Sequence, residues 1–138
     1  MALAPGDGPR HMAYHPSLPV VYVLNELSNT VVMATRHASG NFRETQRIST
    51  LPSDFSEHSQ AAAIYINEAA NILYVSNRGH DSIAVFSISQ SGHLDLLQVV
   101  STEGHWPRSF LVLEALDMML IANQESNSIT VFDIDKSG

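Results

Sequence analysis

Apolar runs rich in β-branched and aromatic residues alternate along this chain with short polar segments, most clearly in the stretch 72–86. Here the apolar runs 72–76 and 83–88 flank a polar centre, 77–82. Two such runs joined by a polar segment predict antiparallel strands connected by a short loop. Arg78 lies in the polar centre and is therefore expected on the loop.

The same pattern occurs three times. Asn25, Asn77 and Asn123 align with one another, and around them three segments match without a gap: 10–40, 62–92 and 108–138. Each segment closes on a Ser-Gly pair. The spacing between the asparagines is 52 and then 46 residues, because a longer connection, 51–61, follows the first copy.

Each copy contains up to four strand signals, which in the second copy fall at 62–66, 72–76, 83–88 and 94–100. Residues that favour tight turns separate them, and no run has the apolar spacing of an amphipathic helix. A four-stranded unit that repeats about every 40 to 50 residues is typical of a β-propeller blade. We therefore predict an all-β fold, a partial β-propeller domain over 1–138 with an incomplete third blade, whose blade units are approximately 8–52, 58–104 and 105–138.

A propeller needs roughly four to eight blades to close its ring, and blades bury their apolar faces on their neighbours. About three blades therefore leave apolar faces open. Two interpretations follow: other chains complete the ring, or the sequence is a piece of a larger protein. In either case the open blade edges are candidate surfaces for self-association.

Composition and charge narrow the classes of partner. The formal net charge is -7, which argues against a nucleic-acid partner because such domains usually present a basic face. No segment approaches the ~20 apolar residues of a membrane helix, and the first residues lack a signal-peptide pattern. The chain has no cysteine, so it offers neither a disulfide nor a thiolate metal site. We expect a cytoplasmic protein without a membrane partner, metal or cofactor.

Five polar side chains are expected on one rim of the propeller. The first and second strands of a blade are antiparallel, so Arg10, which enters the first strand, lies near Glu26, which leaves the second. By the alignment, Arg78 and Gln124 take the place of Glu26 in the next two blades, and Arg108 takes that of Arg10.

A carboxylate between guanidinium groups suits lactone chemistry on an anionic sugar acid or diacid. Guanidinium groups bind carboxylates, phosphates and developing oxyanions, and the carboxylate can orient or deprotonate a water molecule. The alternative is that Arg10 and Glu26 form an ordinary ion pair between neighbouring strands. Arg108 and Gln124 are then a solvated rim residue and a loop amide.

Several longer strings resemble the lactonase family of seven-bladed propellers, which includes bacterial 6-phosphogluconolactonase of the cycloisomerase-2 type and the carboxy-cis,cis-muconate lactonizing enzyme. The resemblance covers essentially the whole chain. The strings that carry it are Gly8-Pro9-Arg10-His11, His15-Pro16, Tyr22-Val23-Leu24-Asn25-Glu26-Leu27, the segment 74–86, Trp106-Pro107-Arg108-Ser109-Phe110 and Ala122-Asn123-Gln124-Glu125-Ser126.

The resemblance implies a catalytic set of Arg10, Glu26 and Arg78, matched residue by residue to the family's Gly-Pro-Arg, Asn-Glu and Ser-Asn-Arg motifs. It also implies a histidine from an earlier blade, for which this chain has no corresponding segment. The implied reaction is hydrolysis of 6-phosphogluconolactone, a small anionic substrate. The substrate-binding candidates are Arg10, Arg78, His11, Arg108 and Gln124. One alternative is a lactonizing cycloisomerase of the carboxymuconate type, and another is a propeller segment that acts only as a binding or structural module.

Three other features carry weaker signals. His11 and His15 share a strand face but lack a third ligand, so a metal site is not expected. The run His80-Asp81-Ser82 contains the residue types of a nucleophilic triad, but adjacent residues in a turn rarely converge. Asp81 aligns with Asn29 and Asn127 and is therefore interpreted as a turn former. For Trp106 the sequence favours a packing role, and a place on the rim is the alternative.

Overall fold

A computed structural model describes residues 1–135 and contains three antiparallel sheets that follow one another along the chain. Within each sheet the strands pair in chain order. The first sheet comprises β1 (Pro9–Tyr14), β2 (Val20–Asn25), β3 (Thr30–Arg36) and β4 (Phe42–Ser49). The second comprises β5 (Gln60–Ile66), β6 (Ile72–Arg78), β7 (Ser82–Ile88) and β8 (Leu94–Ser101), and the third β9 (Pro107–Leu113), β10 (Met118–Asn123) and β11 (Ser128–Asp133).

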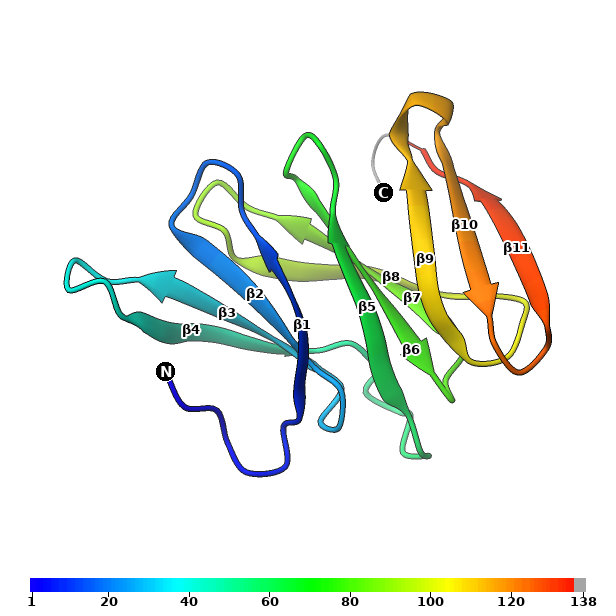
Figure 1. Ribbon diagram of the computed structural model, residues 1–138, viewed down its shortest axis with the longest axis horizontal. Coiled ribbons are helices and arrows are strands. Elements are labelled where there is room, and N and C mark those ends of the chain that lie inside the picture. The colour runs from blue at the N-terminus through cyan, green and yellow to red at the C-terminus, as the bar shows by residue number, and fades with distance from the viewer. Residues whose placement is uncertain (136–138) are drawn as a thin grey trace.

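This architecture confirms the predicted all-β partial propeller. The described residues contain one short helical segment, a 3-10 turn at Glu114–Leu116. The first strands of the three sheets, β1, β5 and β9, lie side by side, and the sheets fan outward from them (Figure 1). No helix in the described part of the chain is long and apolar enough to cross a membrane. The last Ser-Gly pair of the repeat lies outside the described residues.

The structure differs from the sequence expectation at Arg78. This residue is the last of β6, where it pairs with Gln60 of β5, and it is 6% exposed. The loop is therefore shorter than the polar segment suggests and consists of Gly79, His80 and Asp81. The Arg78 side chain can be buried at the end of the strand because the Gln60 and Ala61 carbonyls and the Glu26 carboxylate accept hydrogen bonds from it.

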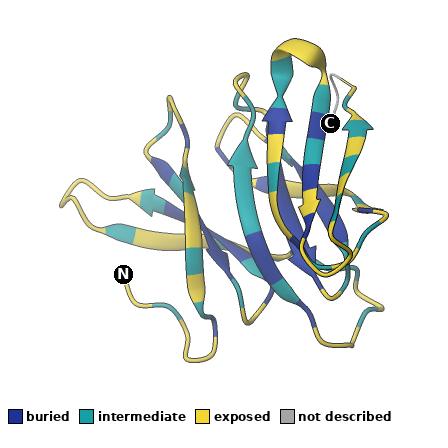
Figure 2. Cartoon of the chain, turned by 45° about the vertical axis from the view of Figure 1, so that its right-hand side comes forward, coloured by how far each residue is buried: buried dark blue, intermediate teal, exposed yellow. Residues whose placement is uncertain are grey.

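Two apolar seams hold the sheets together. Alternate residues of a strand face opposite sides of its sheet, so Leu73 and Val75 pack against the first sheet while Ile72 and Tyr74 pack against the third. All residues of β6 are buried, and Figure 2 shows the burial concentrated on the inner strands. The outward faces of the end sheets keep large apolar side chains exposed: Met12, Tyr14, Leu111, Ile129 and Val131.

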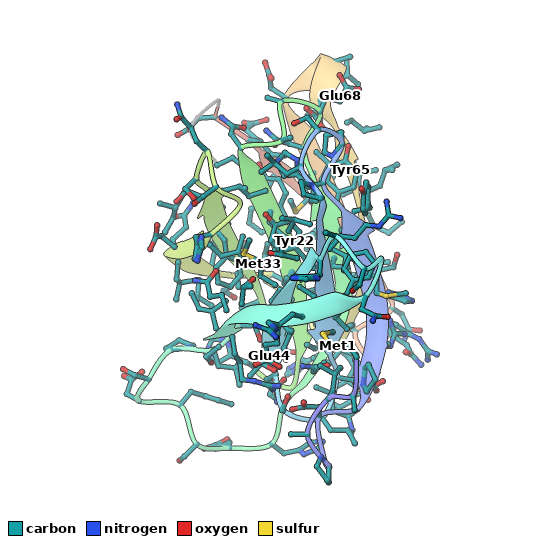
Figure 3. The ribbon with its side chains drawn as sticks, turned by 90° about the vertical axis from the view of Figure 1, so that its left-hand side faces the viewer. Met1, Tyr22, Met33, Glu44, Tyr65 and Glu68 are labelled. Carbon is teal, nitrogen blue, oxygen red and sulfur yellow. The ribbon has the colours of Figure 1, made fainter. Side chains whose placement is uncertain are left out.

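Gly92, the glycine of the Ser-Gly pair in the second copy, packs in the seam between the first and second sheets. Gly92 has φ +87, and a Cβ there would lie 3.1 Å from the Met33 methyl group and 3.3 Å from the Tyr22 hydroxyl. The Tyr22 hydroxyl donates a hydrogen bond of 2.6 Å to the Gly92 carbonyl, and burial raises the pKa of Tyr22 to about 12. Tyr22 and Met33 lie together within the molecule (Figure 3).

The repeated asparagines also have a structural role. Asn77 is fully buried and joins two sheets, because its Oδ1 accepts from the Thr50 hydroxyl at 2.6 Å and its Nδ2 donates to the Thr50 carbonyl at 2.8 Å. Asn25 and Asn123 are buried at the equivalent places, and their amides donate to Thr30 and Thr130. The Asn77 amide thus donates and accepts at once, which suits its buried position.

An ion pair ties the N-terminal segment to the first sheet and predicts an acid-sensitive stability. Arg47 donates to both carboxylate oxygens of Asp7, at 2.7 and 3.0 Å, and these bonds hold the pKa of Asp7 below its usual range. A lowered folded-state pKa stabilises the fold above the unfolded pKa, and this stability is lost as the pH falls through the folded pKa. We expect Asp7→Asn to lower the free energy of unfolding at pH 7 by about 2 kcal/mol.

The measurement is urea unfolding of the wild type and Asp7→Asn at pH 7 and at pH 2.5. The difference between the two proteins should shrink at the lower pH. Glu44→Gln is the matched control, since Glu44 pairs with the same Arg47 but its side chain is 35% exposed, against 5% for Asp7. We expect this substitution to cost less than about 1 kcal/mol. Equal effects of the two substitutions at pH 7 would contradict the assignment.

Candidate functional site

Three of the predicted site residues meet where the first and second sheets join. Glu26 follows β2, Arg78 ends β6, and Arg10 lies at a bulge in β1 between Pro9 and His11. Glu26 Oε1 accepts from Arg78 Nη2 at 2.5 Å, and Glu26 Oε2 faces Arg10 Nε at 3.4 Å. The carboxylate is thus held between two guanidinium groups that come from different sheets.

Arg78 is the most constrained of the three. Its Nε donates to the Gln60 carbonyl at 3.2 Å, and its Nη2 also donates to the Ala61 carbonyl at 3.3 Å. The Arg78 side chain is 7% exposed, against 28% for Glu26. Arg78 therefore holds the Glu26 carboxylate from its buried side, while part of the Glu26 side chain remains accessible to water or a ligand.

Arg10 lies on the accessible side and contacts His11. Its Nη1 donates to the carbonyl of Ala62 on β5 and lies 3.0 Å from His11 Nδ1. Burial first, and then the neighbouring Arg78 charge, lower the pKa of Arg10. Burial and the Arg10 charge likewise lower the pKa of His11, which favours its neutral imidazole. The opposing effect of Glu26 on Arg10 is smaller than that of Arg78.

Arg108 and Gln124 form a separate pair beside this group. Arg108 Nη1 donates to Gln124 Oε1 at 3.1 Å. Both line an open hollow of about 610 Å³ whose wall also includes Arg10 and His11. Arg10 therefore belongs both to the group around the Glu26 carboxylate and to the hollow, whereas Glu26 and Arg78 do not line the hollow. Two smaller hollows, of about 160 and 260 Å³, lie against Tyr74 between the second and third sheets and contain none of these residues.

Trp106 belongs to this site, although the sequence pattern favours a packing role for it. The Arg78 guanidinium lies 5.6 Å from the centre of the Trp106 ring, a cation–π arrangement, and the His58 ring stacks on Trp106 at 6.5 Å. The sequence offers one signal, since Trp106 aligns with Gly8. The structure gives both residues a positive φ, 63° and 62°. A bulky residue where another copy needs glycine indicates a specific role.

The structure also places the weaker candidates. His80 Nδ1 lies 2.7 Å from the Ser82 hydroxyl, but Asp81 turns away and accepts from the Trp106 amide at 2.8 Å, so no triad forms. His15 Nδ1 accepts from the Leu18 amide at 3.1 Å. Within residues 1–135, no three histidine or acidic side chains lie close enough to hold a metal ion together.

Comparison with known proteins relates this geometry to a family. The chain is 49% identical over 112 residues to 6-phosphogluconolactonase of Bacillus subtilis, a match that covers 80% of this chain and 32% of that protein. The periplasmic gluconolactonase of Pseudomonas aeruginosa superimposes with a TM-score of 0.94 at 31% identity, covering 100% of this chain and 39% of that one. A protein of Lactobacillus plantarum gives a TM-score of 0.94 at 33% identity, covering 99% and 40%.

The chain thus spans about a third of the length of the curated relatives that it matches. The solved structures agree, since each of these matches uses about 40% of a longer chain. The family model described as "Lactonase, 7-bladed beta-propeller" matches residues 1–138. The chain therefore belongs to the lactonase family of seven-bladed β-propellers.

Proposed function

We propose that this chain provides the reacting groups of a lactonase that hydrolyses 6-phosphogluconolactone. One observation carries the proposal: the Glu26 carboxylate is held at 2.5 Å by the buried Arg78 and faces Arg10 at 3.4 Å, with part of its side chain accessible. The relative from B. subtilis is named a 6-phosphogluconolactonase, which supports the same substrate.

The arrangement can perform the steps of lactone hydrolysis. Glu26 takes a proton from a water molecule while the water oxygen attacks the lactone carbonyl carbon. The carbonyl oxygen becomes an oxyanion, which the Arg10 guanidinium stabilises. The bond between the carbonyl carbon and the ring oxygen then breaks, and the ring oxygen receives the proton that Glu26 took. The products are a free hydroxyl group and a carboxylic acid.

The charges around the site favour a substrate with a second anionic group. Three guanidinium groups, of Arg10, Arg78 and Arg108, interact electrostatically around one nearby carboxylate, in a chain whose formal net charge is -7. A local positive excess of this kind attracts phosphate, which a guanidinium binds through paired hydrogen bonds. The hollow beside Arg10 offers Arg108 as the phosphate ligand. Because a doubly charged phosphate ester does not cross a bilayer unaided, the enzyme has to share the compartment in which its substrate is formed, and we propose that this compartment is the cytoplasm.

The proposal is tested by following the conversion of 6-phosphogluconolactone to the acid at pH 7 with the purified chain, and subtracting the spontaneous rate. We expect a rate that rises in proportion to protein concentration. Sedimentation in the same buffer tells whether the active species is one chain or an assembly of several. A folded sample that leaves the spontaneous rate unchanged at every concentration would contradict the proposal for this chain.

Arg108→Gln separates recognition of the phosphate from the chemistry. We expect KM for 6-phosphogluconolactone to rise at least about 10-fold, because a charged hydrogen bond contributes about 1.5–3 kcal/mol. The KM for unphosphorylated gluconolactone should change less than about two-fold. Arg43→Gln is the matched control, since Arg43 is exposed on β4, away from the site. An equal rise in KM for both lactones would rule out Arg108 as the phosphate ligand.

A further inference from the structure

The carboxylate of Asp81 joins the second sheet to the segment that enters the third. Its Oδ1 accepts from the Gly79 amide at 3.1 Å and from the Trp106 amide at 2.8 Å. Its Oδ2 lies 2.8 Å from His105 Nδ1. Asp81, in the turn after β6, therefore holds His105 and Trp106, the two residues that precede β9.

These contacts fix Trp106 in a conformation that it does not adopt readily. Its φ of 63° is in the left-handed region, which is unfavourable for a bulky residue. The Asp81 bond to its amide and the bond from the Gln124 amide to its carbonyl, at 3.0 Å, hold this backbone on both sides. The indole ring is thereby directed against the Arg78 guanidinium.

The equivalent position of the first sheet shows that this joining role recurs. Asn29 aligns with Asp81, has a similar φ of 50°, and donates from Nδ2 to the Ser59 carbonyl at 2.8 Å. Ser59 aligns with His105, so each turn side chain reaches the entry of the next sheet. At the junction of the second and third sheets the turn residue is the acid Asp81, and the segment that it holds places the Trp106 ring on Arg78. The segment held at the junction of the first and second sheets places no aromatic ring on an arginine of the site.

We infer that Asp81 is a positioning residue for the site, acting through Trp106 on Arg78 and hence on Glu26. Asp81 sets the backbone of Trp106, and the Trp106 ring covers the guanidinium. The guanidinium in turn holds the carboxylate at 2.5 Å. The structural part of this inference stands on these contacts alone, and its catalytic part rests on the proposed function.

Intrinsic fluorescence tests the structural part, because Trp106 is the only tryptophan of the chain. Asp81→Gly removes the carboxylate and keeps a residue that adopts the positive φ without strain. We expect its emission maximum to shift to longer wavelength and acrylamide quenching to increase at least about two-fold. Asp81→Asn retains an acceptor for the Trp106 amide and should resemble the wild type. Asn29→Gly, the same loss at the other turn, should also leave the emission unchanged.

The catalytic part is tested by lactone hydrolysis with the same variants. We expect kcat/KM of Asp81→Gly to fall about 10-fold through kcat, with recovery in Asp81→Asn. Altered fluorescence with wild-type kcat/KM would overturn the positioning role, and unaltered fluorescence would overturn the whole inference. If the wild type shows no lactone turnover, the proposed function fails, while the fluorescence result still decides whether Asp81 positions Trp106.

A measurement on the unmodified protein covers the case in which Asp81→Gly does not fold. Hydrogen exchange of the Trp106 amide, followed by NMR, should be at least about 100-fold slower than in an unstructured peptide, because this amide donates to Asp81 Oδ1. Exchange of the Trp106 amide at the unstructured rate in an otherwise protected protein would overturn the inference.

Discussion

Glu26→Gln is expected to lower kcat/KM for hydrolysis of 6-phosphogluconolactone at least about 100-fold, the size of a typical general-base contribution. The amide cannot take a proton from water at neutral pH. Its oxygen can still accept from Arg78, so the local structure is retained better than in an alanine variant. The fall should therefore appear mainly in kcat, measured at saturating lactone.

Glu57→Gln provides the matched control. Glu57 is exposed in the connection between β4 and β5, and we expect its variant to keep wild-type kinetics. Circular dichroism should show that both variants retain the β-sheet spectrum. If Glu26→Gln hydrolyses the lactone at more than a third of the wild-type rate, then Glu26 is only an ion-pair partner and another group activates the water.

Arg78→Met should have the largest effect on stability. It removes the donors to the Gln60 and Ala61 carbonyls and the charge that faces Glu26 and Trp106. Breaking a fully buried pair costs about 3–5 kcal/mol, and the partial exposure of Glu26 reduces this cost because water hydrates the remaining carboxylate. We expect the free energy of unfolding to fall by about 3 kcal/mol, measured by urea unfolding.

Two other variants separate charge from geometry at this place. Arg78→Lys keeps the charge but loses the planar fork, so we expect it to recover about half of the lost stability and little of the activity. Arg43→Met, on the exposed β4, should change the free energy of unfolding by less than about 0.5 kcal/mol. Equal stabilities of Arg78→Met and Arg43→Met would mean that the bonds of Arg78 do not contribute to the fold.

The fold was predictable from the sequence because its determinants are local and repeated. Alternating apolar residues define strand faces, and turn residues recur at the same offsets from Asn25, Asn77 and Asn123. The proximity of Arg10 and Glu26 was predictable for a similar reason, since antiparallel pairing within one sheet brings them together. The assignment of catalytic roles came from the family resemblance and stays a prediction.

Contacts between sheets were less predictable. Register within a sheet does not set the distance from Glu26 to Arg78, which depends on how two apolar faces pack. The polar segment 77–82 predicts a loop position for Arg78, whereas its side chain is buried in the seam, where backbone carbonyls and Glu26 accept from it. The sequence favours a packing role for Trp106. Its contact with Arg78 is not visible in the pattern, because it depends on Asp81 of the preceding turn, which holds the Trp106 amide.

The position of Glu26 and Arg78 on opposite sides of a seam couples ligand affinity to the association of the two sheets. A ligand that contacts residues of both sheets binds only the docked state, and by mass action each tenfold excess over its Kd adds about 1.4 kcal/mol to the stability of that state. Conversely, any substitution that opens the seam weakens binding even when it touches no ligand atom. Substrate and core side chains thus act on the same equilibrium, and loss of affinity can accompany loss of packing in the interior of the fold.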